Sequence, residues 1–219
     1  MADQRADIEW NGAVPVSRAF DDPYFSLEDG LAETRHVFVD GNDLGARLVP
    51  GFHVAELGFG TGLNLLALAE LAWELGVEGV RYTGFEAFPM TAEEMARALE
   101  AFPGLSGRAA LAGAWGRGVS FTIGGVAAEV VVGDARKMLP GWPGVADAWF
   151  LDGFAPSRNP ELWEPGLLAE VARHTAPGGT AATYSAAGDV RRGLEAAGFA
   201  VERRPGFGRK RHMTVARLS

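Results

Sequence analysis

Cysteine is absent from the 219 residues of this chain, and histidine occurs only four times. Without cysteine the chain has no disulfide, thiolate zinc site, iron–sulfur cluster or cysteine nucleophile. The histidines stand at positions 36, 53, 174 and 212, so no two of them have the close spacing of metal ligands. We therefore expect no metal site.

Long apolar runs are also missing. No stretch approaches the roughly 18 continuous apolar residues of a membrane-spanning helix. Residues 1–18 carry scattered acids in place of a basic region followed by an apolar one, which argues against a secretion signal. We expect a soluble, cytoplasmic protein with no membrane partner, folded as one domain over 1–219 with an N-terminal extension or cap at 1–50 and a core at 51–219.

Positive charge is scarce, because 28 acids outnumber 20 lysines and arginines and leave a net charge of -8. Averaged over the whole chain, this negative charge would repel a nucleic acid and argues against such a partner. From Arg173 onward, however, nine basic residues face only three acids. Any basic surface is therefore expected in the last quarter of the chain.

The residues from position 52 onward alternate between strand, turn and helix patterns, which is typical of a parallel sheet covered on both faces. Strands are predicted at 53–57, 81–86, 127–132, 148–151, 180–184, 199–203 and 212–218, with a small hairpin insertion at 119–123. Helices are predicted at 63–75, 92–101, 160–174 and 189–197. A short loop joins the last two strands, so they should be antiparallel. Before this core, Asn11-Gly12 predicts a hairpin turn, and 21–40 should contain a helix.

The stretch VAELGFGTG at 54–62 lies where a buried strand passes into a helix. Gly58, Gly60 and Gly62 permit a sharp turn and let a ligand approach the main chain and the helix N-terminus. The dinucleotide fingerprint G-x-G-x-x-G needs a third glycine where Leu63 stands. The spacing found, preceded by the acid Glu56, instead resembles the cofactor turn of Rossmann-like S-adenosylmethionine methyltransferases. A tight turn without a ligand is the alternative.

Acids end three successive predicted strands. Glu86 closes the second, where a carboxylate accepts hydrogen bonds from ribose hydroxyls in adenosine-binding enzymes of either kind. Asp134 follows the third, where an acid receives the adenine amino group in methyltransferases; a surface acid is the alternative. Asp152 follows the fourth within DAWFLDGFAPSRNPELW at 147–163, which places it at the carboxyl edge of the sheet, where ligands of open α/β sheets bind.

Four stretches together closely resemble one family. They are the segment at 147–163, PVSRAFDDPYFS at 15–26, YSAA at 184–187 with RRGL at 191–194, and GFGRKR at 206–211. The family is the tRNA methylaminomethyl-thiouridine methyltransferases, found as the methyltransferase half of bifunctional MnmC enzymes and as free-standing MnmD. The resemblance implies a class I methyltransferase fold: a mostly parallel seven-stranded sheet with an antiparallel terminal strand and a small N-terminal β/α extension.

The resemblance also implies an activity and its partners. The methyl group of S-adenosyl-L-methionine would pass to the amine of an aminomethyl group on a wobble uridine, which is often thiolated, in the anticodon arm of tRNA. In the bifunctional enzymes a flavin-dependent oxidase domain supplies that amine. The chain ends at Ser219 without such a domain, so we expect it to perform only the methyl step.

Single residues receive roles from their position and chemistry and, for Tyr24, Glu33 and Tyr184, from the same resemblance. Asp152 is the candidate for orienting the amine and accepting its proton, with binding of the cofactor's methionine ammonium as the alternative. Asn64 is expected at the methionine end, and Tyr24 and Glu33 near the cofactor. Phe154 would stack on the uracil or simply pack in the core, and Tyr184 is expected beside the substrate.

Arg209, Lys210 and Arg211 form the basic cluster expected to contact tRNA phosphates, with a solvated charge run as the alternative. Two rival functions remain at this point. A methyltransferase acting on a small-molecule or protein amine would keep the cofactor residues but not need this cluster. A non-enzymatic nucleotide-binding module would keep the glycine turn and transfer no methyl group.

Overall fold

The computed structural model describes residues 5–26 and 28–219, so positions 1–4 of the expected extension lie outside it. The chain begins with a small antiparallel sheet of β1 (Ile8–Asn11), β2 (Val14–Ser17) and β3 (Asp22–Pro23). Gly12 at the tip of the first hairpin has a φ of +61°, which confirms the turn predicted at Asn11-Gly12. Next come α1 (Gly30–Thr34), the π-helix η1 (Arg35–Asp40) and α2 (Leu44–Arg47).

In the described part of the chain, the main sheet has eight strands in the order β10-β11-β9-β8-β4-β5-β7-β6. Their bounds are β4 (His53–Leu57), β5 (Arg81–Glu86), β6 (Ser120–Ile123), β7 (Val126–Val132), β8 (Ala146–Leu151), β9 (Thr175–Thr183), β10 (Phe199–Pro205) and β11 (His212–Leu218). Strands β4, β5, β7, β8 and β9 are parallel, whereas β11 is antiparallel to both its neighbours. The predicted seven strands are all present. The eighth, β6, is the hairpin insertion, which pairs with β7 and becomes the edge.

The remaining helices of the described residues are α3 (Leu63–Glu74), α4 (Ala92–Leu99), α5 (Arg108–Trp115), α6 (Ala135–Met138), η2 (Leu139–Gly141), η3 (Pro160–Trp163), α7 (Pro165–Arg173) and α8 (Gly188–Ala196). Thr91 caps α4, and its hydroxyl and the Glu94 carboxylate form a capping box. The helix predicted at 160–174 is in fact two, because the extended backbone at Glu164 ends η3 before Pro165 begins α7. Helices α2, α5 and α6 were not predicted from the sequence.

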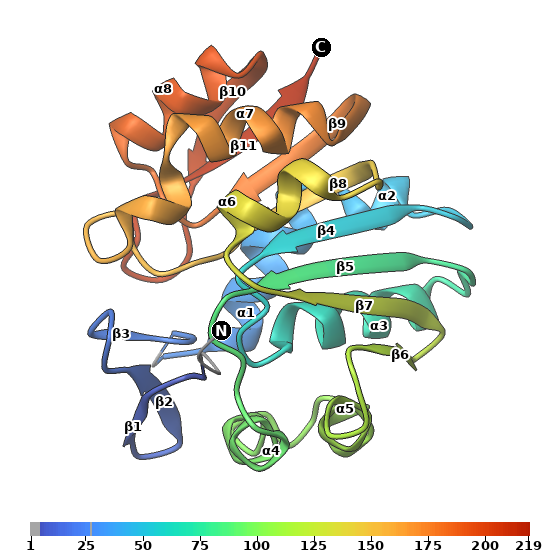
Figure 1. Ribbon diagram of the computed structural model, residues 1–219. Helices are drawn as coiled ribbons and strands as arrows, with labels where there is room; N and C mark the ends of the chain where they lie inside the picture. The colour runs from blue at the N-terminus through green and yellow to red at the C-terminus, as the bar shows by residue number, and fades with distance from the viewer. Residues whose placement is uncertain (1–4, 27) are drawn as a thin grey trace.

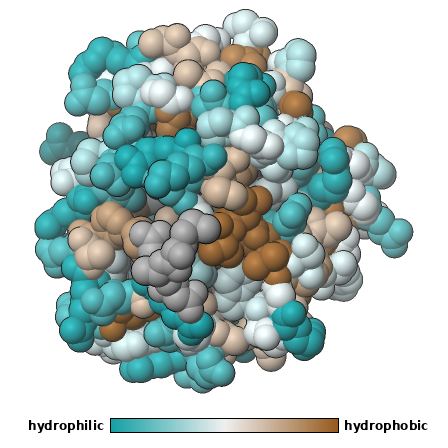
Figure 2. Space-filling view, in the orientation of Figure 1, coloured by the Kyte–Doolittle hydropathy of each residue, from teal (hydrophilic) through white to brown (hydrophobic). Residues whose placement is uncertain are grey.

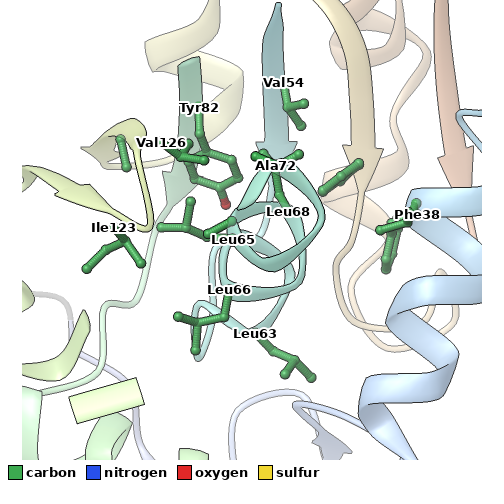
Figure 3. Packing of buried hydrophobic residues seen from close by; sticks show 14 of the residues in the cluster. Phe38, Val54, Leu63, Leu65, Leu66, Leu68, Ala72, Tyr82, Ile123 and Val126 are labelled. Carbon is green, nitrogen blue, oxygen red and sulfur yellow. The ribbon is translucent and has the colours of Figure 1, made fainter. Parts of the chain in front are cut away.

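The sheet separates two apolar cores, because alternate side chains of each strand point to opposite faces. Val54 and Ala148 belong to the core shared with α3, α4, α5 and η1, and their neighbours Ala55 and Trp149 belong to the core shared with α6, α7 and α8. In Figure 3 the side chains of α3 pack against the strands of the first core. The surface view of Figure 2 is mostly hydrophilic or neutral, with one hydrophobic group near its centre.

The strand order reverses at β4, since β5 and β7 lie on one side of it and β8 and β9 on the other. Open α/β sheets bind ligands outside the carboxyl ends of the strands at such a switch point. In Figure 1 the arrowheads of β4, β5 and β7 point towards the side where the small β1–β3 sheet lies. The N-terminal segment therefore stands over the expected binding edge. Within the described residues, no helix combines the length and apolarity that a membrane crossing requires.

Candidate functional site

A cavity of about 600 Å³ opens at this edge of the sheet, a volume typical of small-molecule sites. It brings together predicted residues from seven separate parts of the chain: Tyr24, Glu33, Gly58, Gly60, Asn64, Glu86, Asp134, Asp152, Phe154, Tyr184, Arg209 and Lys210. Three predicted residues do not line it. Glu56 is fully buried beneath the cavity, Gly62 is the N-cap residue just before α3, and Arg211 is exposed on the terminal loop.

The glycine turn after β4 has a backbone that other residues rarely adopt. Gly58, Gly60 and Gly62 have φ values of +84°, +52° and +76°. A Cβ on Gly58 would lie 1.9 Å from the carbonyl oxygen of Asp152, so glycine here lets the ends of β4 and β8 meet closely. The turn is held to the neighbouring strand by the Gly58 N–H, which donates to the Phe85 carbonyl at 2.9 Å.

The carboxylate of Glu86, at the end of β5, is a hydrogen-bond acceptor that the protein already holds in place. Its two oxygens accept backbone hydrogen bonds from Gly60 and Phe88, each at 2.8 Å. Burial raises the pKa of this carboxyl, while the backbone donors act in the opposite direction. Each carboxylate oxygen has a second lone pair, so the fixed group can accept two further donors from a ligand such as a ribose.

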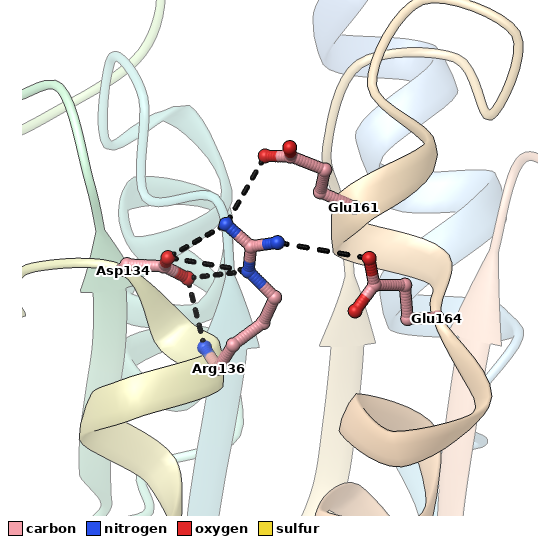
Figure 4. Close-up of polar contacts among 4 residues, drawn as sticks. All are labelled: Asp134, Arg136, Glu161 and Glu164. Atoms are coloured by element: carbon pink, nitrogen blue, oxygen red, sulfur yellow. Dashed lines mark hydrogen bonds and ion pairs between the residues drawn. The ribbon is translucent and has the colours of Figure 1, made fainter.

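Asp134 lines the cavity but already has a protein partner. Its Oδ1 accepts from the backbone N–H of Arg136 at 3.0 Å, and its Oδ2 accepts from the Arg136 guanidinium at 2.8 Å. These hydrogen bonds are the main reason that the pKa of Asp134 is lowered. Figure 4 shows the guanidinium of Arg136 between Asp134 and the acids Glu161 and Glu164 from the facing wall. Recognition of adenine by Asp134 stays a prediction, and it would have to be shared with this ion pair.

A chain of buried polar groups runs beneath the cavity. The Tyr82 hydroxyl and the Asn64 amide both donate to the Glu56 carboxylate. The Asn64 amide nitrogen also donates to Asp152 Oδ2 at 2.7 Å, and its oxygen accepts from the Thr34 hydroxyl at 2.9 Å. One amide therefore links two carboxylates and the N-terminal helix α1. The expected contact of Asn64 with the cofactor stays a prediction, and the structure shows its amide hydrogen-bonded to both carboxylates.

The surroundings of Asp152 shift the pKa of its carboxyl towards neutral pH. Burial raises the pKa of Asp152 from 3.8 to about 7; the acids Glu33 and Asp22 add to the rise, whereas Asn64 and Lys210 oppose it. A carboxyl with such a pKa is half ionised near neutrality, which suits general base catalysis. Glu56 below it has a raised pKa for the same reason, burial, and Asp152 adds to that rise.

Aromatic side chains form one wall. The ring of Phe154 stacks on Phe20 with centroids 4.8 Å apart and meets Tyr24 edge-on at 5.1 Å. Asp22 fixes the loop beneath them, because its carboxylate accepts from the backbone N–H of Ala155 at 2.8 Å. One ring face of Phe154 is therefore already covered, while the residue still lines the cavity. Both predicted roles, base stacking and packing, stay open.

The basic terminal loop reaches into the cavity and is ion-paired there. Lys210 Nζ lies 2.7 Å from Glu33 and 4.0 Å from the centre of the Tyr184 ring. Arg209 Nε lies 2.8 Å from the carboxylate of Glu28. This cluster was predicted to contact tRNA phosphates or to be a solvated charge run, but two of its three members neutralise acids of the N-terminal segment.

Several cavity residues were not predicted. Phe20 and Asp22 lie within the stretch 15–26 that carried the resemblance, but a stretch does not reveal which side chains point inward. Arg136 had a local signal, since a basic residue two positions after a capping acid can reach back to it. Glu28 had none, because its partner Arg209 is distant in sequence. Among the described residues, no group of three or more acids and histidines is arranged to hold a metal ion.

Comparisons with known proteins agree with this geometry. The sequence profile of a family described as S-adenosyl-L-methionine-dependent methyltransferase matches residues 109–219. A tRNA 5-methylaminomethyl-2-thiouridine biosynthesis bifunctional protein MnmC from Pseudomonas aeruginosa (strain UCBPP-PA14) is 42% identical over 225 residues, which cover 96% of this chain and 34% of the relative. The MnmC protein of Caulobacter sp. (strain K31) is 47% identical over 235 residues, covering 99% and 39%. The chain thus spans little more than a third of the length of these relatives.

Solved structures give the same result for the fold. MnmC2 from Aquifex aeolicus superposes with a TM-score of 0.74 at 25% identity, covering all of this chain and 72% of that one. A methyltransferase from Pyrococcus furiosus superposes with a TM-score of 0.51 at 17% identity, covering 97% and 88%. The predicted class I methyltransferase fold is confirmed.

Proposed function

The chain belongs to the family of S-adenosyl-L-methionine-dependent methyltransferases and is related to the MnmC proteins, and from this premise we propose that it methylates the amine of an aminomethyl group on the wobble uridine of tRNA. The product is the 5-methylaminomethyl derivative of uridine or 2-thiouridine. A flavin-dependent oxidase, as a further domain or a separate protein, supplies the amine. One observation carries the proposal: Glu86, whose carboxylate is held in place, and Asp152, whose pKa is raised, line the same cavity.

The hydrogen-bond acceptors that line the cavity fit the cofactor. Glu86 offers free lone pairs on two fixed oxygens to the ribose hydroxyls, and Asp134 offers an acceptor to the adenine amino group. The turn from Gly58 to Gly62 lets the main chain approach, and Tyr24 lies against Gly60. When bound, S-adenosyl-L-methionine supplies an electrophilic methyl group.

The substrate amine has to lose a proton before it can attack. An aliphatic ammonium has a pKa near 10.4, the value for lysine, so it enters the site mostly protonated at neutral pH. Asp152 accepts that proton, because its own pKa of about 7 leaves much of it ionised. Asn64 fixes the carboxylate by donating to Oδ2, which holds the acceptor in place while the new bond forms.

The tRNA contacts come from the loop between β10 and β11. Arg211 is exposed there, and Arg209 and Lys210 are available once phosphates compete for their present acid partners. The loop borders the cavity, so contacts with the anticodon arm would bring the wobble base to Asp152.

Mass analysis of wobble nucleosides tests the proposal. Purified protein is incubated with S-adenosyl-L-methionine and with tRNA whose wobble uridines carry the unmethylated aminomethyl group. We expect aminomethyluridine to gain the mass of one methyl group, and the Asp152→Asn variant to lose most of this conversion.

The controls separate this function from its rivals. tRNA with an unmodified wobble uridine should gain no methyl group, and small amines or peptides should not replace tRNA as acceptors. Methylation of such amines with no reaction on tRNA would overturn the proposed substrate but keep the enzyme class. Cofactor binding without any methyl transfer would overturn both.

A further inference from the structure

A primary ammonium already lies within the cavity. Lys210 Nζ is held by the carboxylate of Glu33 at 2.7 Å and stands 4.0 Å from the centre of the Tyr184 ring. The Tyr184 hydroxyl donates to the Gly153 carbonyl at 2.5 Å, which ties the ring to the residue after Asp152. A carboxylate beside an aromatic face is a favourable site for an alkylammonium ion, through ion pairing and cation–π attraction.

The two members of the ion pair differ in burial. The Glu33 side chain is only 12% exposed, whereas that of Lys210 is 45% exposed and belongs to the basic terminal loop. Lys210 can therefore turn outward to solvent or to a phosphate with little loss of packing. Glu33 would then remain as a mostly buried carboxylate without a cation, an unfavourable state that a second cation would relieve.

We propose that Glu33 and the ring of Tyr184 form the recognition subsite for the substrate's aminomethyl group, and that Lys210 occupies this subsite until tRNA arrives. The substrate group is a primary alkylammonium of the same kind as the lysine head group. The inference rests on the proposed function, deepens it to the recognition of the amine, and assigns Glu33 to the substrate in place of the cofactor.

The position of the subsite suits the next step. Lys210 lowers the pKa of Asp152 and Glu33 raises it, so both are close enough to interact with its charge. An ammonium held by Glu33 would therefore also interact with the proposed base. The same loop carries Arg209 and Arg211, which phosphates of the anticodon arm would attract. Binding of tRNA would thus draw Lys210 away as the wobble base enters, so a free site is offered mainly to the correct substrate.

Calorimetry with the nucleoside 5-aminomethyluridine tests the subsite, because a nucleoside lacks the phosphates that would displace Lys210. The protein is first saturated with S-adenosylhomocysteine. We expect Lys210→Ala to bind the nucleoside about tenfold more tightly than the wild type, the change that 1.4 kcal/mol of lost competition produces. Adding Glu33→Gln to this variant should abolish the gain, and 5-hydroxymethyluridine, which has no ammonium, should show no gain.

Two controls make the result specific. Arg203→Ala removes an exposed positive charge from β10, next to the loop, and should leave nucleoside affinity at the wild-type value. Methylammonium should raise the melting temperature of Lys210→Ala more than that of the wild type, because it refills the empty subsite.

The outcomes also separate this inference from the proposed function. If the wild type methylates aminomethyl-tRNA but Lys210→Ala binds the nucleoside no better, or gains equally for the hydroxymethyl analogue, the subsite is wrong and the function stands. If no tRNA is methylated while the ammonium-specific gain appears, the subsite stands and the tRNA assignment fails.

Discussion

At the scale of single residues, three buried carboxyl groups of the site destabilise the fold. Burial is the largest cause of the raised pKa of Glu56, Glu86 and Asp152. A structural role would be served better by amides or apolar groups, because buried carboxylates are expensive unless they are paired. Acids with raised pKa values gathered around one cavity instead mark a site whose chemistry depends on their charge.

Asp152→Asn should change how stability depends on pH. The folded-state pKa of Asp152 is about 7 against an ordinary 3.8, so its contribution to the free energy of unfolding is greatest at low pH and is lost as pH rises through that window. At about 1.36 kcal/mol for each pH unit up to the folded-state pKa, the wild type should lose about 2 to 3 kcal/mol more than the variant between pH 5 and pH 8. Chemical denaturation at both pH values measures this. Equal losses would mean that Asp152 is ionised at both.

Asp152 should also control the pH dependence of turnover. Because the base acts only when ionised, kcat of the wild type should rise with pH and level off above an apparent pKa near 7. Asp152→Asn should lower kcat about 10²- to 10⁴-fold, the usual contribution of a general base. Its residual rate should keep rising towards the pKa of the substrate amine. A variant that retains the bend near pH 7 would assign that bend to another group.

At the scale of elements, the site depends on where β4 and β8 end. The Gly58 turn and the chain at Asp152 lie so close that no side chain fits between them. The Asp152 N–H donates to the Leu57 carbonyl at 3.1 Å, which continues the pairing of the two strands up to the turn. The strand ends therefore set the position of the proposed base relative to the cofactor turn.

Gly58→Ala should severely destabilise the protein. The new Cβ would meet the Asp152 carbonyl oxygen at 1.9 Å, and φ would remain at +84°. Gly12→Ala is the matched control, because Gly12 also has a positive φ of +61° but open space around its Cβ position. We expect a loss of about 1 kcal/mol for the control, the usual strain of this conformation, and several times more for Gly58→Ala. Thermal unfolding compares the two, and similar losses would show that the strand ends can move apart.

Much of this arrangement could be predicted from sequence, because periodic signals carry it. The alternation of strand and helix and the acids at strand ends placed Gly58, Glu86 and Asp152 at one edge. Contacts between distant segments carry no such signal, so the pairing of Arg209 with Glu28 was not anticipated. The break between η3 and α7 was missed as well, because one helix was predicted over 160–174 and the proline inside that range, Pro165, begins a second helix.

Over the whole molecule, the charge distribution disfavours binding of tRNA except in the last quarter of the chain. A net charge of -8 repels a polyanion, and the basic surplus is confined to the last quarter of the chain. Ion pairs from the terminal loop to Glu28 and Glu33 join this region to the N-terminal segment above the cavity. If tRNA is the substrate, as proposed, acids of that segment would compete with it for the loop.

Glu28→Ala should strengthen tRNA binding by releasing Arg209 for phosphate. Both side chains of this ion pair are largely exposed, at 92% for Arg209 and 52% for Glu28, so breaking it should cost the fold little. An exposed pair contributes about 0.5 to 1 kcal/mol, which corresponds to a two- to fivefold gain in affinity. If Arg209 makes a new phosphate contact, the slope of log K against log salt should steepen by about one.

Glu78→Ala is the control for the effect of net charge. Glu78 is exposed and precedes β5, at the edge of the sheet opposite the cavity, so its removal changes the total charge equally but frees no loop arginine. Its tRNA affinity and salt slope should stay close to wild-type values when both are titrated between about 50 and 200 mM salt. Equal gains in affinity for the two variants would show that tRNA binding depends only on the overall charge. The terminal loop would then not be part of the interface.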